Sequence, residues 1–242
     1  MANTTTAIIT GASRGLGEVL ARFLAGQGYD LVLTARHAEP LEAVARSLNT
    51  YGVTVKTLIG DVADAAHRQA VIDAAGANLA VLINNASDLG VSPLPALADY
   101  PLDALERVFK INVIAPLALT QLALPALKAN GGIVVNLSSD AAKGGYEGWG
   151  GYGMTKAALD LASLTMANEL RGENVSVVSV DPGDMRTVMH QDAFPGEDIS
   201  DRPLPDVTVP FWAWLFGQNR MAVSGGRYAA QADRWEAVNE TV

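Results

Sequence analysis

The sequence predicts an α/β protein built on one doubly wound parallel sheet with helices on both faces. Six short runs rich in β-branched and aliphatic residues alternate with longer helical patterns, as in consecutive β-α-β units. Most of these runs are continuously apolar, which is typical of strands buried on both faces. The 242 residues, 49% of them hydrophobic, are enough for one substantial core, so we expect a single domain over residues 1–242.

Each expected strand is followed by enough chain for a crossover helix. In chain order the strands are TTAIIT (5–10), DLVLT (30–34), VTVKTLI (53–59), LAVLI (79–83), GIVVNL (132–137) and VSVVSV (175–180). A seventh strand is possible within 220–238. The chain after Pro182 is acidic, contains prolines and lacks a clear period. Because ligands in such folds bind beyond the carboxyl ends of the strands, we expect a substrate lid at about 186–215, with a surface loop as the alternative.

Charge and composition exclude several classes of partner. A net charge of −9 would repel a phosphate backbone, so we expect no nucleic-acid partner. We find no run of about 18 apolar residues that could span a membrane. The N-terminus leads directly into a strand, and we expect a cytoplasmic protein. The chain has no cysteine, and its three histidines form no metal-binding spacing with carboxylates, so no metal is expected.

A glycine-rich turn follows the first strand, with the pattern T-G-x-x-x-G-x-G from Thr10 to Gly17. Glycines permit a tight turn and a close approach of the backbone to a ligand, and the helix that follows offers unpaired N–H groups to a pyrophosphate. The same pattern could serve turn geometry alone. We interpret it as a dinucleotide site with Gly11, Ser13, Arg14, Gly15, Leu16 and Gly17 as contacts.

The second strand ends where dinucleotide-binding folds test the adenosine ribose. An acidic side chain there would accept a hydrogen bond from the 2′-hydroxyl, whereas an arginine would pair with a 2′-phosphate. The chain has Ala35 and Arg36 at this place, and Arg14 supplies a second cation. Each arginine taken singly could be an ordinary surface residue. Together with the missing acid, they predict a preference for NADP(H) over NAD(H).

A tyrosine and a lysine four residues apart, Tyr152 and Lys156, follow a second glycine-rich stretch. Residues at i and i+4 share one helix face, so both polar tips can reach one point near the start of a helix. A nearby ammonium favours the phenolate of a tyrosine, whose ordinary pKa is about 10. Such a pair is more often a packed aromatic residue beside a lysine stem. The neighbouring motifs therefore decide whether this pair is catalytic or only packed.

Five motifs occur in one order and spacing. They are T-G-x-x-x-G-x-G, N-N-A at 84–86, a serine at the end of the fifth strand, Y-x-x-x-K, and D-P-G at 181–183. In this combination the chain resembles the short-chain dehydrogenase/reductase family, in its branch with chains of about this length. The resemblance runs from Thr5 to about Thr187. It implies a Rossmann-type fold and NADP(H)-dependent transfer of hydride between nicotinamide and a carbonyl or alcohol group.

By this resemblance, four residues form the catalytic set. Tyr152 is the general acid or base, and Lys156 lowers the pKa of its phenol and reaches the nicotinamide ribose. Ser139 donates a hydrogen bond to the substrate oxygen, and Asn112 holds a water that links the lysine to solvent. Ser138 precedes Ser139 and is expected to face the other side of the strand.

The family's other cofactor contacts carry over one at a time. They are Asp61 and Val62 at the adenine, Asn84 and Ala86 at the adenosine ribose, and Pro182, Gly183 and Thr187 at the nicotinamide. The chain departs from the family pattern at two places. Ser87 stands where glycine is usual, and residues 184–186 replace a bulky hydrophobic and valine pair.

The substrate pocket is expected to be apolar and partly aromatic. Its expected lining residues are Tyr146, Trp149, Met189 and Phe194, whose alternative role is loop packing. These residues suit a small carbonyl or alcohol substrate whose charge stays open. Two other functions remain open: a non-catalytic NADP(H)-binding sensor or interaction protein, and an enzyme of epimerisation or dehydration through transient hydride transfer.

Two helical runs are expected at a subunit interface. The helix at 152–171 is apolar almost all round, although a helix on one sheet face needs only one apolar stripe. The resemblance suggests that its second side, with the helix at 101–127, meets a second copy in a homodimer or homotetramer. The aromatic run VPFWAWLFG (209–217) could cover the pocket or a subunit contact, and we favour packing within the chain.

Overall fold

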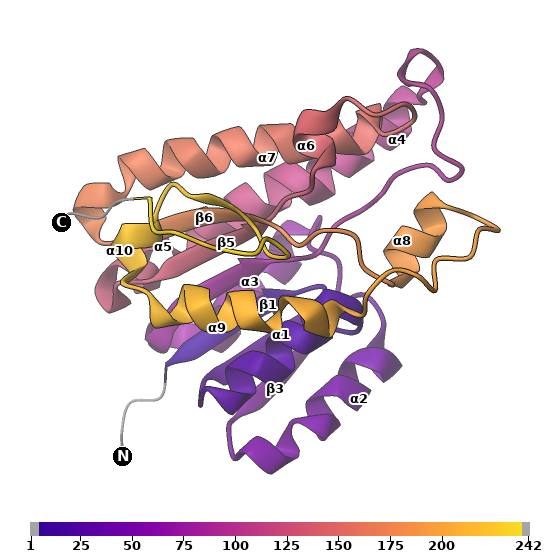
Figure 1. Cartoon of the computed structure of the whole chain (residues 1–242). Helices are drawn as coiled ribbons and strands as arrows, with labels where there is room; N and C mark the ends of the chain where they lie inside the picture. Colours follow the sequence, from indigo (N-terminus) through magenta and orange to yellow (C-terminus); the bar gives the residue numbers. More distant parts are fainter. Residues whose placement is uncertain (1–4, 239–242) are drawn as a thin grey trace.

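The computed structural model of the protein describes residues 5–238 (Figure 1). Within them, seven strands form one parallel sheet in the order β3-β2-β1-β4-β5-β6-β7. The strands are β1 (Thr6–Thr10), β2 (Asp30–Ala35), β3 (Val55–Ile59), β4 (Leu79–Asn84), β5 (Ile133–Leu137), β6 (Ser176–Asp181) and β7 (Arg227–Ala229). The predicted doubly wound parallel sheet is confirmed, and the seventh strand is present at its edge.

Helices connect the strands and cover both faces of the sheet (Figure 1). They are α1 (Gly15–Gly26), α2 (Ala38–Ser47), α3 (Ala65–Ala75), α4 (Leu102–Phe109), α5 (Ala115–Asn130), α6 (Ala141–Gly144), α7 (Gly150–Glu169), α8 (Val188–Ala193), α9 (Val209–Gly217) and α10 (Arg220–Val223). A π-helical segment, Lys110–Ile114, joins α4 to α5.

The two faces of the sheet bury separate cores because successive strand residues point to opposite sides. Ile9 of β1 packs into the core that α1, α2 and α9 cover. Its neighbour Ile8 packs into the other core, beneath α3, α5 and α7. All residues of β1, β4, β5 and β6 are buried. This explains the continuously apolar strands of the sequence.

Helix α9 contains the aromatic run and belongs to the covering layer. Phe211 and Trp212 are fully buried in the core beside α1. Trp212 Nε1 donates a hydrogen bond to Thr208 Oγ1 at 2.9 Å, so the indole is satisfied inside the protein. Packing within the chain is therefore the role of this run. The expected lid at about 186–215 thus includes residues from 209 onward that lie in this packed helix.

The continuous helix from Leu102 to Asn130 is long and apolar enough, by length and composition, to cross a membrane, with a mean hydropathy of 1.4. The expectation that no run of the chain is apolar and long enough to span a membrane is therefore corrected, by length and composition. Of its most apolar window, 44% is buried inside the protein. Its residues Ala115, Leu119 and Leu127 pack into the core against the sheet, as the core helix of a globular protein does.

From β1 the chain adds β2 and β3 toward one edge of the sheet, and it then returns to add β4, β5, β6 and β7 toward the other edge. The strand order therefore reverses between β1 and β4. In open parallel sheets, a crevice forms outside the carboxyl ends of the strands at such a switch point. The glycine-rich turn follows β1 and the N-N-A motif begins at the last residue of β4. The fold thus brings two of the sequence motifs to one place.

Candidate active site

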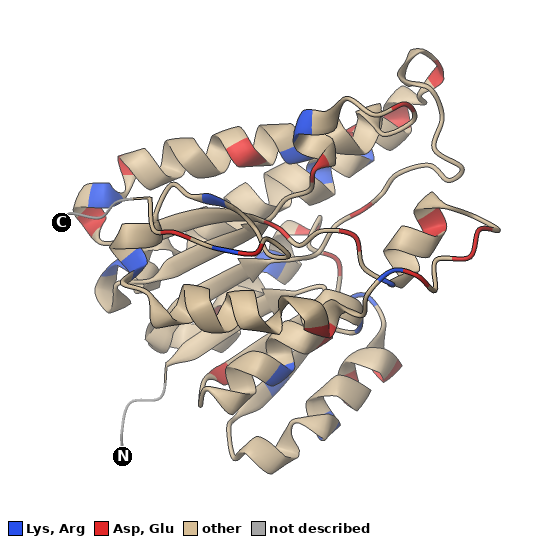
Figure 2. Cartoon of the chain, in the orientation of Figure 1, with Lys and Arg blue, Asp and Glu red and all other residues tan. Residues whose placement is uncertain are grey.

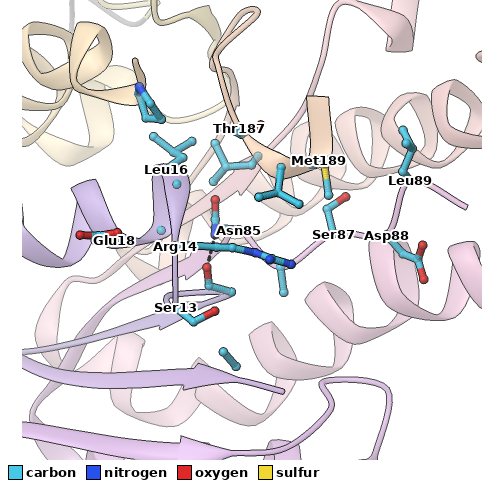
Figure 3. A pocket seen from close by; sticks show the side chains of 18 of the residues that line it. Ser13, Arg14, Leu16, Glu18, Asn85, Ser87, Asp88, Leu89, Thr187 and Met189 are labelled. Carbon is cyan, nitrogen blue, oxygen red and sulfur yellow. Dashed lines mark hydrogen bonds between the residues drawn. The ribbon is translucent and has the colours of Figure 1, made fainter. Parts of the chain in front are cut away.

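A cleft with a cavity volume of 660 Å³ runs across the carboxyl ends of the strands. Figure 3 shows side chains of the glycine-rich turn, of the segment after β4 and of the segment after β6 around one pocket. Tyr152 and Lys156 are among the residues that line it. The cleft therefore joins the expected dinucleotide turn to the expected catalytic pair.

The glycine-rich turn requires glycine at two positions for different reasons. Gly11 has a φ of 66°, in the left-handed region that side chains rarely adopt. A Cβ on Gly17 would lie 2.2 Å from the carbonyl oxygen of Gly11, so only glycine allows α1 to start this close to the turn. No side chain caps the N-terminus of α1. Its first N–H groups are left for an anion in the cleft.

The two asparagines of the N-N-A motif have separate roles. Asn84 Nδ2 donates to Asn136 Oδ1 at 2.8 Å between β4 and β5, and Asn84 does not line the cleft. Asn85 lines the cleft and donates from Nδ2 to the carbonyl oxygens of Thr10, at 2.9 Å, and Gly11, at 3.1 Å. The expectation for Asn84 is therefore corrected. Asn85 is the residue that fixes the glycine-rich turn against β4, and the sequence analysis missed it.

The predicted cofactor residues otherwise gather at this cleft. Those that line it are Gly11, Ser13, Arg14, Gly15, Leu16, Gly17, Ala35, Arg36, Asp61, Val62, Ala86, Tyr152, Lys156, Pro182 and Thr187. Gly183 lines a neighbouring cavity instead.

Arg14 and Arg36 are the exposed cations expected to read the ribose. Both line the cleft, and neither has a carboxylate partner within residues 5–238. No acidic residue stands at the end of β2. Two unpaired guanidinium groups beside a helix N-terminus fit a dinucleotide with an additional phosphate.

Tyr152 and Lys156 lie on the first turns of α7, and both are buried. Lys156 Nζ donates to the carbonyl oxygen of Leu137 at 2.7 Å and lies 5.3 Å from the centre of the Tyr152 ring. The hydrogen bond anchors the lysine to the end of β5. The two groups thus share one helix face beside the sheet, as the i and i+4 spacing predicts.

Burial dominates the protonation of both groups. It raises the pKa of the Tyr152 phenol, with smaller increases from Asp181 and Asp140 and an opposing contribution from the Ser87 hydroxyl. Burial lowers the pKa of Lys156 from 10.5 to about 8. In the chain alone, Tyr152 is therefore a neutral phenol. The expected lowering of its pKa needs positive charge beyond that of Lys156.

Asn112 lies in the π-helical segment and is fully buried. Its Nδ2 donates to the Asp88 carbonyl oxygen at 2.9 Å and to Thr155 Oγ1 at 3.0 Å, while its Oδ1 accepts from the Asp88 N–H at 2.8 Å and from Ser87 Oγ at 3.2 Å. Its side chain thus fixes the segment after β4 against α7. No hydrogen bond joins this side chain to Lys156 among the described residues.

Ser138 and Ser139 both follow the last residue of β5. Ser138 lines both cavities, and its buried Oγ has no hydrogen-bond partner in the described part of the chain. Ser139 lines the smaller cavity, where its Oγ donates to Asp140 Oδ1 at 3.0 Å. The structure thus brings both serines to the second cavity, and the choice of Ser139 over Ser138 stays a prediction.

A second cavity of 400 Å³ lies beside Tyr152, away from the glycine-rich turn. The four side chains expected in the substrate pocket line it: Tyr146, Trp149, Met189 and Phe194. The Trp149 ring centre lies 5.9 Å from that of Tyr152 and 6.0 Å from that of Phe194. Helix α8 forms the outer wall, and acidic residues mark this helix and the loop after it (Figure 2).

Within residues 5–238, no group of three or more histidine or acidic side chains is arranged to hold a metal ion.

Comparisons with known proteins agree with this geometry. The family model described as short chain dehydrogenase matches residues 5–198. Serine 3-dehydrogenase of Agrobacterium fabrum is 36% identical over 74% of this chain and 71% of its own length. L-xylo-3-hexulose reductase of Hypocrea jecorina is 33% identical over 95% of this chain and 81% of its own length.

Solved structures extend the agreement to the fold. A short chain dehydrogenase from Shigella flexneri 2a, solved in complex with NADP, superimposes with a TM-score of 0.86 and 29% identity, over 94% of this chain and 97% of the other. The motifs, the cleft and these matches give one answer: the chain belongs to the short-chain dehydrogenase/reductase family and is an NAD(P)-dependent dehydrogenase or reductase.

Proposed function

We propose that this protein is an NADP(H)-dependent oxidoreductase that transfers hydride between nicotinamide and a small carbonyl or alcohol substrate, with Tyr152 as general acid or base. The arrangement of Tyr152 and Lys156 in the cleft carries the proposal. A neutral phenol buried next to an ammonium group is suited to donate a proton to a substrate oxygen during reduction and to take it back during oxidation.

The residues of the cleft fit the cofactor. The N-terminus of α1 would hold the pyrophosphate, Arg14 and Arg36 the 2′-phosphate, and Lys156 the nicotinamide ribose. When bound, NADP(H) supplies or accepts hydride and, in its oxidised form, carries the positive ring charge that favours the Tyr152 phenolate. The Shigella relative bound to NADP supports this choice of cofactor.

The chain's own residues would place the substrate oxygen. Ser139 donates a hydrogen bond to it, where negative charge develops during hydride transfer. Lys156 holds positive charge below the phenol, and Asn112 positions the segment that includes Ser87. The aromatic wall of the second cavity keeps water from the reacting carbon. The named relatives act on serine and on a hexulose, which are both small molecules with hydroxyl or carbonyl groups.

We propose that residues 186–208 form the substrate lid. Met189 and His190 of α8 line the second cavity, while the Arg186 N–H donates to the Pro203 carbonyl oxygen at 2.8 Å. Farther along, Asp206 forms an ion pair with Arg22 of α1 at 2.5 Å. These contacts hold the segment over the cleft, and opening of the lid would break them.

We also propose a homodimer or homotetramer of a cytoplasmic enzyme. Leu161 and Leu164 of α7 are 67% and 48% exposed, and Leu102 and Ile114 on the neighbouring long helix are 73% and 52% exposed. Large apolar side chains exposed on adjacent helices are typical of a subunit contact. Their position supports the interface expected from the sequence.

The test is turnover of NADPH and NADH, separately, with a panel of neutral ketones and aldehydes. We expect consumption of NADPH that is lost in Tyr152→Phe. Binding of NADPH without turnover of any carbonyl would favour the non-catalytic alternative. Arg36→Asp provides the matched test of cofactor choice: it should weaken NADPH and improve NADH. Turnover that prefers NADH in the unmodified protein would refute the proposed role of Arg36.

A further inference from the structure

The second cavity is strongly acidic. Four carboxylate side chains line it, and no lysine or arginine is among its lining residues. The four are Asp140, Glu147, Asp181 and Asp184. They come from the segment between β5 and α7, from the last residue of β6 and from the segment after it, so the fold concentrates negative charge beside Tyr152.

Two of these carboxylates are paired with arginines behind the cavity wall. Asp181 Oδ2 lies 3.7 Å from Arg227 Nη2, and Asp184 Oδ2 lies 3.6 Å from Arg202 Nε. Neither arginine lines the cavity. The paired carboxylates are thus held in place without bringing a positive charge into the substrate space.

The other two carboxylates are left without such partners. Asp140 and Glu147 form no ion pair with a lysine or arginine in the described part of the chain. Asp140 accepts a hydrogen bond from Ser139 Oγ at 3.0 Å, which places one carboxylate directly beside the serine of the proposed reaction. The cavity therefore keeps a net negative charge that a bound cation would compensate.

Aromatic rings form another part of the wall. Trp149 packs edge-on against Tyr152 at an interplanar angle of 70°, and Phe194 tilts against Trp149 at 50°. Ring faces attract ammonium groups and exclude water from them. Carboxylates together with aromatic faces are a setting that favours an alkyl ammonium over a carboxylate or phosphate.

Two buried polar atoms in this wall have no protein partner. Ser138 Oγ and His190 Nε2 make no hydrogen bond among residues 5–238, and each side chain is at least nine-tenths buried. His190 Nδ1 lies 3.8 Å from Asp184 Oδ1. Buried polar groups are normally satisfied, so these two atoms mark the part of the wall where a ligand's polar groups would complete the hydrogen bonds.

We propose that this cavity selects a small alcohol or ketone that carries an ammonium group within a few bonds of the reacting carbon. This inference rests on the proposed function, because it uses the same tyrosine and the same hydride transfer. In oxidation, the carbinol carbon gives hydride to NADP⁺ and the hydroxyl gives its proton to Tyr152, so that a ketone forms. The ammonium group is unchanged and serves recognition alone.

The experiment compares three alcohols of matched skeleton: 1-aminopropan-2-ol, butan-2-ol and 3-hydroxybutanoate. They are cationic, neutral and anionic at pH 7, since an alkyl ammonium resembles that of lysine, with an ordinary pKa of about 10.4. We expect kcat/KM with NADP⁺ to be higher for 1-aminopropan-2-ol than for butan-2-ol by about two- to fivefold, because three of the four carboxylates are exposed to solvent, where each charge pair is weak. The anion should be the poorest substrate.

Two variants test the source of the preference. Asp140→Asn and Glu147→Gln should each reduce the ratio of kcat/KM between the cationic and the neutral alcohol, whatever their effect on the turnover of butan-2-ol itself. Glu106→Gln removes an exposed carboxylate on α4, outside both cavities, and should leave the ratio unchanged. This control separates the local charge of the cavity from the net charge of the protein.

Several outcomes would overturn the inference. They are a ratio near one, a preference for 3-hydroxybutanoate, a ratio that neither variant changes, and failure to oxidise any of the three alcohols while NADPH is still consumed with neutral carbonyls. The proposed function would instead be overturned if no turnover of any tested substrate depended on Tyr152. The two failures can therefore be told apart.

Discussion

Lys156→Met should make the protein more stable at neutral pH while abolishing turnover. Methionine is unbranched and apolar and can occupy the space of the buried lysine stem. Burial lowers the pKa of Lys156 from 10.5 to about 8. At about 1.4 kcal/mol per pKa unit, burying the charged form costs about 3 kcal/mol. Loss of the hydrogen bond to Leu137 offsets about 1 kcal/mol, so the expected net gain is about 2 kcal/mol.

The pH dependence gives this prediction its sign. The folded-state pKa of Lys156 is below the unfolded value, so the unfolded chain binds more protons between about pH 8 and 10.5. The cost of burying the charge is complete below pH 8 and disappears above pH 10.5. The variant should therefore be more stable at pH 7, and about equal to the unmodified protein at pH 10.

Urea unfolding at pH 7 and pH 10, at one protein concentration, measures the difference. Lys110→Met is the matched control, because Lys110 is exposed and its charge remains in water. A loss of stability at pH 7 would refute the reasoning, and so would a gain that persists unchanged at pH 10. Either result would mean that the Lys156 ammonium is compensated inside the folded protein.

Three further predictions follow from the site. Ser87→Gly removes the hydroxyl that lowers the pKa of Tyr152, so the basic limb of the pH profile of kcat/KM should move to higher pH with KM little changed; an unchanged profile would assign Ser87 to packing. Ser139→Ala should lower kcat by about a hundredfold, as loss of one donor to a developing oxyanion does, and more than Ser138→Ala does; the reverse order would give that role to Ser138. Leu161→Glu should shift the elution of the protein to that of a smaller species in size-exclusion chromatography, whereas an unchanged elution would exclude α7 from the interface.

The sheet and the cofactor cleft could be predicted from the sequence because their signals are local. Continuous apolar runs identify strands buried on both faces, and the glycine pattern records a backbone constraint that Gly11 and Gly17 show directly. The four-residue spacing of Tyr152 and Lys156 fixes their common helix face. Each of these inferences depends on only a few consecutive residues.

Other features depend on contacts between distant segments. Asn84 and Asn85 are adjacent in sequence, and only the hydrogen bond across to Asn136 shows which one turns away from the cleft. Ser138 and Ser139 both line the second cavity, and only the segments that close this cavity from elsewhere in the chain show it. The aromatic run of α9 would suit a lid or a core equally well, and its neighbours in space decide between them.

The charge of the second cavity and the acidity of Tyr152 are coupled. After burial, Asp181 and Asp140 raise the pKa of the phenol, and the same carboxylates line the proposed ammonium site. A bound ammonium group would offset their negative charge and lower the pKa of Tyr152, whereas butan-2-ol would not. The pH profile of kcat reports pKa values in the enzyme–substrate complex. The limb of this profile that Tyr152 sets should therefore lie at lower pH with 1-aminopropan-2-ol than with butan-2-ol. Equal profiles would place the ammonium group away from Asp140 and Asp181. In this arrangement, the residues that select the substrate would also adjust the acid that acts on it.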